Sequence, residues 1–142
     1  MVVAIDGPRG SGKSVALEVL RRSGVRVAPM PFVDVPQAWP LRSVATSCAW
    51  IVEWARTVSD TSATVVETSP LAAVAFHPQH AAVLRPLAEA VLADLQVDVV
   101  LVRGDGDGSE FFDTLDLPRF DDASAVVQHL LSKETCGRRR SS

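Results

Sequence analysis

A glycine-rich segment between two apolar runs constrains the fold of this chain most strongly. Residues 7–14 read Gly-Pro-Arg-Gly-Ser-Gly-Lys-Ser and fit the spacing G-x-x-x-x-G-K-[ST] at every fixed position. The preceding residues, 2–6, are short, apolar and β-branched, as in a buried strand. Apolar side chains recur at helical spacing over residues 13–22, and Gly24 follows where such a helix would end. A strand, a tight turn and a helix in this order predict the first unit of an α/β fold.

A turn of this kind is also a binding site for a polyphosphate. Its successive backbone N–H groups and the N-terminus of the next helix point toward one place, where they can hold phosphate oxygens. We expect Lys13 to reach the β- and γ-phosphates and the Ser14 hydroxyl to bind Mg²⁺. The predicted cofactors are therefore ATP and Mg²⁺. The predicted nucleotide-binding residues, together called the phosphate loop, are Gly7, Pro8, Arg9, Gly10, Ser11, Gly12, Lys13 and Ser14.

Strand and helix patterns alternate along the rest of the chain. Further strands are predicted at residues 25–28, 63–67 and 97–102, with a short edge strand at 112–117. Helices are predicted at residues 41–58, 70–76, 81–95 and 122–133, and the proline-rich residues 29–40 predict a loop. This order predicts the three-layer α/β fold of P-loop NTPases, with a mainly parallel sheet of four or five strands.

Composition limits the class of protein. The 142 residues are 47% apolar and 22% charged, which is ordinary for a globular chain, so we expect one domain over residues 1–133 and a polar, flexible tail at 134–142. The net charge of −3 argues against a general nucleic-acid binder. Cys48 and Cys136 form no CxxC pair and are interpreted as reduced thiols. With no signal peptide and no membrane-spanning run in the sequence, we expect an intracellular, cytoplasmic protein.

Three segments carry a family resemblance. Residues 5–14 contain the phosphate loop, and residues 34–39 read Asp-Val-Pro-Gln-Ala-Trp. Residues 67–78 read Glu-Thr-Ser-Pro-Leu-Ala-Ala-Val-Ala-Phe-His-Pro. In content and order these segments resemble landmarks of the herpesviral thymidine kinases and the wider deoxynucleoside kinase family. The resemblance covers residues 2–78 and includes the interval from Lys13 to Asp34. If the chain is viral, its cytoplasm would be that of the host cell.

The resemblance implies a role for each matching residue. Lys13 and Ser14 would hold phosphate and Mg²⁺, and Glu67 would position Mg²⁺ with its water shell. Asp34 would be the general base that takes the proton of a nucleoside 5′-hydroxyl, and Trp39 would line the nucleoside pocket. The implied enzyme is a nucleoside kinase that serves DNA synthesis by phosphorylating thymidine or a relative with ATP. Ligands of open α/β sheets bind at the carboxyl edge, so we expect Asp34 and Glu67 to lie there with Lys13.

The sequence also departs from the family pattern. Thr68 stands where the family has an arginine, and residues 103–108, where the family has a lid with several arginines, contain one arginine and two aspartates. Residues 41–62 contain no Gln or Asn to read a base. Loss of one well-placed cation costs on the order of 10²–10³ in rate, so an isolated enzyme is expected to be slow. Two alternatives stay open: a nucleotide-binding module that acts through a partner, and a P-loop kinase or ATPase for another small acceptor.

Other assignments stay open as well. A second alignment matches residues 29–31 to a Pro-acid-Pro pattern and would place Met30, instead of Asp34, at the position of the base. Trp50 and Trp54 are four residues apart on one helix face, and we expect them to be core residues rather than stacking partners of a base. The sequence does not fix the oligomeric state, and a homodimer is among the options.

Overall fold

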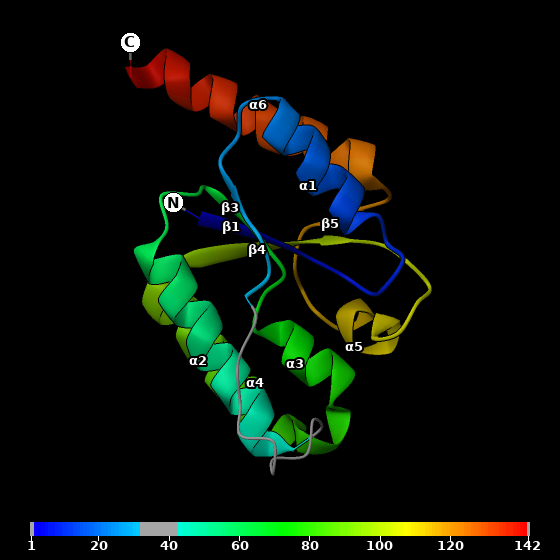
Figure 1. Ribbon diagram of the computed structural model, residues 1–142. Coiled ribbons are helices and arrows are strands. Elements are labelled where there is room, and N and C mark those ends of the chain that lie inside the picture. Colours follow the sequence, from blue (N-terminus) through cyan, green and yellow to red (C-terminus); the bar gives the residue numbers. More distant parts are fainter. Residues whose placement is uncertain (1, 32–42, 142) are drawn as a thin grey trace.

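The sheet of this protein has five strands, all parallel, in the order β2-β3-β1-β4-β5. It lies between two layers of helices (Figure 1). The computed structural model describes residues 2–31 and 43–141. The strands are β1 (Val2–Asp6), β2 (Val27–Ala28), β3 (Val65–Glu67), β4 (Val97–Val102) and β5 (Arg119–Phe120). The helices are α1 (Lys13–Arg22), α2 (Val44–Asp60), α3 (Leu71–Phe76), α4 (Ala81–Leu95), α5 (Ser109–Asp113) and α6 (Ala123–Ser141), and a 3₁₀ turn (Pro78–His80) joins α3 to α4.

Strand β1 lies at the centre of the sheet and pairs on both sides. Val3 is in register with Val65 of β3 and with Asp98 of β4. Successive side chains of a strand point to opposite faces, and both Ala4 and Ile5 are fully buried. The loop that follows β1 therefore emerges between β3 and β4, at the carboxyl edge of the sheet.

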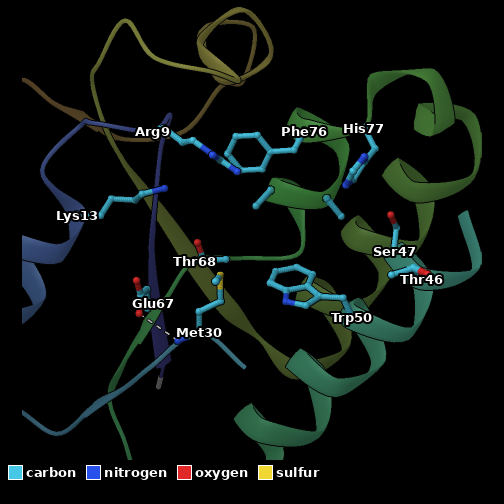
Figure 2. Close-up of a pocket in the computed structure, with 12 residues that line it drawn as sticks. Arg9, Lys13, Met30, Thr46, Ser47, Trp50, Glu67, Thr68, Phe76 and His77 are labelled. Atoms are coloured by element: carbon cyan, nitrogen blue, oxygen red, sulfur yellow. Dashed lines mark hydrogen bonds between the residues drawn. The ribbon is translucent and has the colours of Figure 1, made fainter. Parts of the chain in front are cut away.

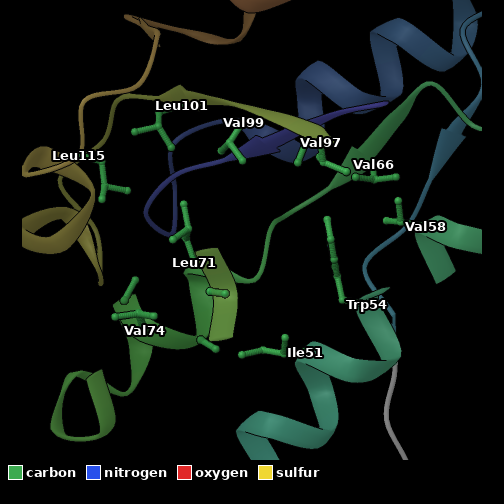
Figure 3. Packing of buried hydrophobic residues seen from close by; sticks show 14 of the residues in the cluster. Ile51, Trp54, Val58, Val66, Leu71, Val74, Val97, Val99, Leu101 and Leu115 are labelled. Atoms are coloured by element: carbon green, nitrogen blue, oxygen red, sulfur yellow. The ribbon is translucent and has the colours of Figure 1, made fainter. Parts of the chain in front are cut away.

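A hydrophobic core covers each face of the sheet. On one face, α1 and α6 pack on β1, β3 and β4; the buried residues there include Ile5, Leu17, Leu20, Val100, Val126 and Leu130. On the other face, α2, α3, α4 and α5 pack on the sheet, and the buried residues there include Ala4 and Leu84. Figure 3 shows further members of this core: Ile51, Trp54, Val66, Leu71, Val99 and Leu101. The three-layer α/β fold expected from the sequence is confirmed.

The predicted elements are mostly found, with shifted bounds. The expected helix 41–58 runs from Val44 to Asp60, because the Ser43 side chain accepts a hydrogen bond from the N–H of Thr46 and caps its start. The expected strands 25–28 and 63–67 are shorter, at Val27–Ala28 and Val65–Glu67. The last helix continues past Lys133 to Ser141, through residues assigned to a polar tail.

The predicted edge strand at residues 112–117 is wrong. Residues Ser109–Asp113 form helix α5, and the edge strand is Arg119–Phe120, which pairs with β4. The buried side chains in this stretch are Phe112 and Leu115, three positions apart, which is a helical spacing and not the two-residue period of a strand. In the described part of the chain, no helix has the length and apolar character needed to cross a membrane.

Candidate nucleotide-binding site

The phosphate loop joins β1 to α1 at the carboxyl edge of the sheet. Gly7 has a φ of 146°, and a Cβ atom there would collide with the backbone carbonyl of Val102 on β4. Helix α1 begins after Gly12 with no side-chain cap, so the N–H groups of its first turn are left for a ligand. These features give the loop the exposed backbone donors that a phosphate site needs.

Lys13 lies close above this loop. Its Nζ donates a hydrogen bond to the carbonyl of Gly7 at 2.5 Å and is 3.8 Å from a carboxylate oxygen of Asp6. The side chain is only 15% exposed. The ammonium group is thus positioned over the loop by one carbonyl and one buried carboxylate.

Asp6, the last residue of β1, connects the phosphate loop to the turn after β3. Its carboxylate accepts hydrogen bonds from the N–H of Gly7 (2.9 Å), the N–H of Ser69 (3.0 Å) and the Ser69 hydroxyl (2.6 Å). Burial raises the pKa of the Asp6 carboxyl, and the nearby charge of Lys13 with these hydrogen bonds offsets only part of that effect. This fully buried link spans 63 positions of the sequence and was not predicted.

The turn after β3 holds a residue in an unusual backbone conformation. Thr68 has a φ of 68°, in the left-handed region that β-branched residues rarely adopt. Its N–H donates to the carbonyl of Ile5 at 2.8 Å, and its carbonyl accepts from the indole N–H of Trp54 at 3.0 Å. Together with Ser69 bound to Asp6, these contacts hold the strained residue in place.

A cavity of about 480 Å³ opens beside the phosphate loop. Figure 2 shows Arg9 and Lys13 on one side of it and Trp50, Ser47 and His77 on the other, with Thr68 between them. The walls come from the phosphate loop, the segment after β2, the end of β3 with the turn that follows it, helix α2, and helix α3 with the residue after it. They are formed by Arg9, Lys13, Met30, Thr46, Ser47, Trp50, Glu67, Thr68, Ala72, Ala73, Phe76 and His77.

Two tryptophans of α2 divide between the core and the cavity. Trp54 is 1% exposed and belongs to the core, as expected. Trp50 packs against the same core but also lines the cavity, and its indole N–H donates to the carbonyl of Pro31 at 3.2 Å. Ser47, one turn before Ile51, is buried, and its hydroxyl has no hydrogen-bond partner among the described residues.

The structure brings some of the predicted site residues together. Lys13 and Glu67 line one cavity, and a Glu67 carboxylate oxygen accepts a hydrogen bond from the N–H of Met30 at 3.1 Å. Ser14 is exposed in the first turn of α1. Asp34 and Trp39, the predicted base and pocket residue, lie outside the described residues.

The donor set near the loop is compatible with a nucleotide-bound Mg²⁺. No group of three or more metal-ligating side chains occurs in residues 2–31 and 43–133. A magnesium ion on a nucleotide needs fewer, because phosphates and water supply most of its ligands. The Ser14 hydroxyl and the second oxygen of Glu67 are oxygen donors of the type Mg²⁺ prefers.

Most of the residues that form the cavity walls carry no binding signal in the sequence. Phe76 is predicted only as part of the family pattern and Trp50 as a core residue, and no pattern indicates Ser47. Their spacing matches no binding motif, because they come from different helices that meet only in the folded chain. Arg9 is predicted as a loop residue of the nucleotide site, and the sequence offers Arg9, Arg103 and Arg119 as alternative sources of the charge that Thr68 lacks.

Comparison with known proteins supports the fold. No protein-family model and no curated protein matches the sequence. Among solved structures, the chain is similar to the YorR protein of Bacillus subtilis, crystallised in complex with phosphorylated GDP. The TM-score is 0.59 at 9% sequence identity, and the match covers 98% of each chain. At this identity the likeness shows a shared fold.

Proposed function

We propose that this protein binds ATP at the phosphate loop and transfers its γ-phosphoryl group to the 5′-hydroxyl of a nucleoside, thymidine or a relative. The observation that carries the proposal is the cavity beside Lys13. It gives the phosphate loop a neighbouring site for a second molecule, which a simple ATPase does not need. The nucleotide complex of the similar YorR fold supports the first half of the proposal, nucleotide binding.

The cavity suits a nucleoside in size and in chemistry. Its volume of about 480 Å³ lies in the range of small-molecule sites, roughly 300–1,000 Å³. Trp50 and Phe76 offer aromatic surface to a planar base, and Ala72 and Ala73 leave room between them. The hydroxyl of Ser47 is a polar group that a ligand can satisfy after a side-chain rotation.

Each of the residues around the cavity has its own proposed role in phosphoryl transfer. Lys13 and the first turn of α1 offset the negative charge of the phosphates. Ser14 and Glu67 would hold Mg²⁺, which neutralises charge between the β- and γ-phosphates when it is bound. Asp34 is proposed as the base that accepts the proton of the attacking hydroxyl.

A nucleotide-binding module that acts through a partner is the second candidate. Thr68 favours it, because a hydroxyl at this place cannot offset charge on a phosphoryl group as the arginine of the resembling family would. In a homodimer, the partner would be a second copy of this chain. This candidate keeps nucleotide binding and lacks transfer.

A phosphoryl-transfer assay separates the two candidates. Labelled ATP is incubated with a panel of nucleosides, and ATP binding is measured in parallel by calorimetry. We expect transfer to a nucleoside by the wild type, and loss of both ATP binding and transfer in Lys13→Ala. Lys133→Ala, an exposed lysine on α6, is the matched control and should behave as wild type. ATP binding without transfer to any nucleoside would contradict the kinase and favour the module.

A further inference from the structure

The cavity contains two side chains with a full positive charge. Among the described residues, Lys13 and Arg9 are the only lysine or arginine that line it. Transfer of a phosphoryl group develops charge on its three non-bridging oxygens, and a cation beyond the phosphate-loop lysine commonly stabilises that charge. Thr68 cannot do so, which leaves Arg9 as the candidate within the cavity.

Two other arginines near this edge of the sheet have structural roles. The guanidinium of Arg119 donates hydrogen bonds to the carbonyls of Phe112, Asp113 and Leu115, and so holds the end of α5. Arg103 is 61% exposed and lies 3.6 Å from a carboxylate oxygen of Asp121. Neither of these two arginines lines the cavity.

Arg9 is held from both its backbone and its side chain. Its N–H donates to the carbonyl of Asp107 at 3.2 Å, and Gly106 lies so close that a Cβ atom there would collide with the Arg9 carbonyl. The guanidinium carbon lies 5.3 Å from the centre of the Phe76 ring, and Figure 2 shows the two side chains next to each other. Within residues 2–31 and 43–133, no carboxylate forms an ion pair with Arg9, so its charge is not already neutralised there.

The loop at residues 104–108 therefore differs in its role from the arginine-bearing lid of the resembling family. It supports the backbone of the phosphate loop and fixes where the Arg9 side chain starts. The contact of the guanidinium with Phe76 is a weak cation–π interaction at an exposed site, and charge-assisted hydrogen bonds to phosphate oxygens are stronger. The side chain can thus leave the ring when a phosphoryl group enters the cavity.

We propose that Arg9 is a catalytic residue whose guanidinium binds the non-bridging oxygens of the γ-phosphoryl group during its transfer. The inference rests on the proposed function. In the step, the nucleoside 5′-oxygen forms a bond to the γ-phosphorus as the bond from that phosphorus to the β,γ-bridging oxygen breaks. ADP leaves with the bond's electron pair, and the hydroxyl proton passes to the general base. Arg9 exchanges no proton and contributes charge alone.

The test compares Arg9→Met with Arg85→Met. Arg85 is a matched control, since its guanidinium also stacks on a phenylalanine, Phe111, at 5.6 Å but lies on α4 away from the cavity. We expect Arg9→Met to lower kcat by about 10²–10³-fold, with KM for nucleoside and affinity for ATP changed less than about threefold. Arg9→Lys should recover part of kcat, and added guanidinium ion should partly rescue Arg9→Met. Arg85→Met should match wild type.

A measurement of ligand binding complements the kinetic comparison of the variants. An analogue that joins adenosine to thymidine through a polyphosphate chain spans both sites, and Arg9→Met should weaken its binding far more than it weakens ATP binding. An active wild type with an Arg9→Met kcat within threefold overturns the inference and leaves the kinase standing. If Arg9→Met weakens the binding of ATP and of the analogue equally and leaves kcat unchanged, the inference is also overturned. Arg9 would then bind the phosphates of ATP before the reaction and would not stabilise the transition state. A wild type that transfers no phosphate to any nucleoside overturns the proposed function and this inference together.

Discussion

At the scale of single residues, Thr68 and Arg9 line the same cavity, but only Arg9 carries a positive charge. A guanidinium at position 68 would approach the phosphoryl group from the β3 side, where the resembling family carries its arginine. The left-handed φ of 68° tolerates an unbranched arginine better than the β-branched threonine. A cation at either place would act on the same charge.

We therefore expect Thr68→Arg to restore activity to Arg9→Met. The double variant should have a kcat at least about tenfold above that of Arg9→Met, because the new charge acts mainly on the transition state. In the wild-type background the gain should be smaller, since Arg9 already supplies the charge. Steady-state kinetics of the four proteins measures the coupling. Equal gains in both backgrounds would mean that the two positions act independently.

Ser47 gives a prediction about stability. A buried hydroxyl without a hydrogen bond costs about 1–3 kcal/mol, so Ser47→Ala should raise the free energy of unfolding by about 1 kcal/mol. Ser59→Ala on the same helix is the control, because the Ser59 hydroxyl is exposed and donates to the carbonyl of Ala55. Urea denaturation measures both. A less stable Ser47→Ala would show that the hydroxyl has a partner in solution.

The phosphate loop and the cavity beside it differ in how far the sequence alone predicts them. The phosphate loop could be predicted because its glycines, Lys13 and Ser14 have a fixed spacing set by one turn of chain. The hydrogen bonds of Asp6 to Ser69 and the walls formed by Trp50 and Phe76 could not. They depend on the order of strands in the sheet and on how α2 and α3 pack, which no local pattern specifies.

At the scale of elements, the buried carboxyl group of Asp6 links β1 to the turn after β3 through its hydrogen bonds with Ser69. Because burial raises its pKa above that in the unfolded chain, the folded protein keeps the Asp6 proton over an interval of pH in which the unfolded chain has lost it. The contribution of Asp6 to the unfolding free energy is therefore present at low pH and falls as the pH rises through that interval.

Removing the charge of Lys13 should raise the pKa of Asp6 further. In wild type that charge, 3.8 Å away, favours the ionised carboxylate, and Lys13→Ala removes it. The carboxyl ¹³C resonance of Asp6, followed by NMR across a pH titration, measures the pKa in both proteins. Lys133→Ala should leave it unchanged. An unchanged Asp6 pKa in Lys13→Ala would show that the two groups are not close in solution.

The contact between the 104–108 loop and the phosphate loop gives a steric prediction. Gly106→Ala forces a Cβ atom against the Arg9 carbonyl, so it should destabilise the fold by about 1–3 kcal/mol and weaken ATP binding. Gly24→Ala is the control: its φ of 89° makes it strained as well, but open space surrounds it, so stability should fall with ATP binding intact. Thermal unfolding and calorimetry distinguish the two. If Gly106→Ala binds ATP as wild type does, the loop does not support the site.

At the scale of the whole molecule, two cores share one sheet. Leu20→Ala in the α1–α6 core and Leu84→Ala in the opposite core should each lower the unfolding free energy by about 2–5 kcal/mol. Because β1 lies in both cores, each variant should still unfold in one transition. Urea curves followed by circular dichroism and by tryptophan fluorescence should coincide; two of the three tryptophans, Trp50 and Trp54, lie on α2. Separate midpoints would mean that the two layers unfold independently.

The alternation of strands and helices made the whole fold predictable, although the match to YorR is only 9% identical in sequence. Parallel order follows from a helix between successive strands, whichever apolar residues fill them. The secondary-structure predictions are wrong where an element is too short to show a clear hydrophobic pattern. Leu115 and Leu117 are two positions apart, as in a strand, whereas Phe112 and Leu115 are three apart, as in a helical turn, and β5 itself is only two residues long.

The central place of β1 has a consequence for how the protein is made. On the ribosome β1 emerges before either of its neighbours, since β3 begins at Val65 and β4 at Val97. The hydrogen bonds from Ser69 to Asp6 form only after Ser69 has been synthesised, and the close contact of Gly7 with the Val102 carbonyl forms only after β4 is complete. A nascent chain that stops short of β4 therefore carries the whole phosphate-binding motif without the site. If the proposed function is right, we expect the growing chain to gain affinity for nucleotide only late in translation, once the sheet has closed around its first strand.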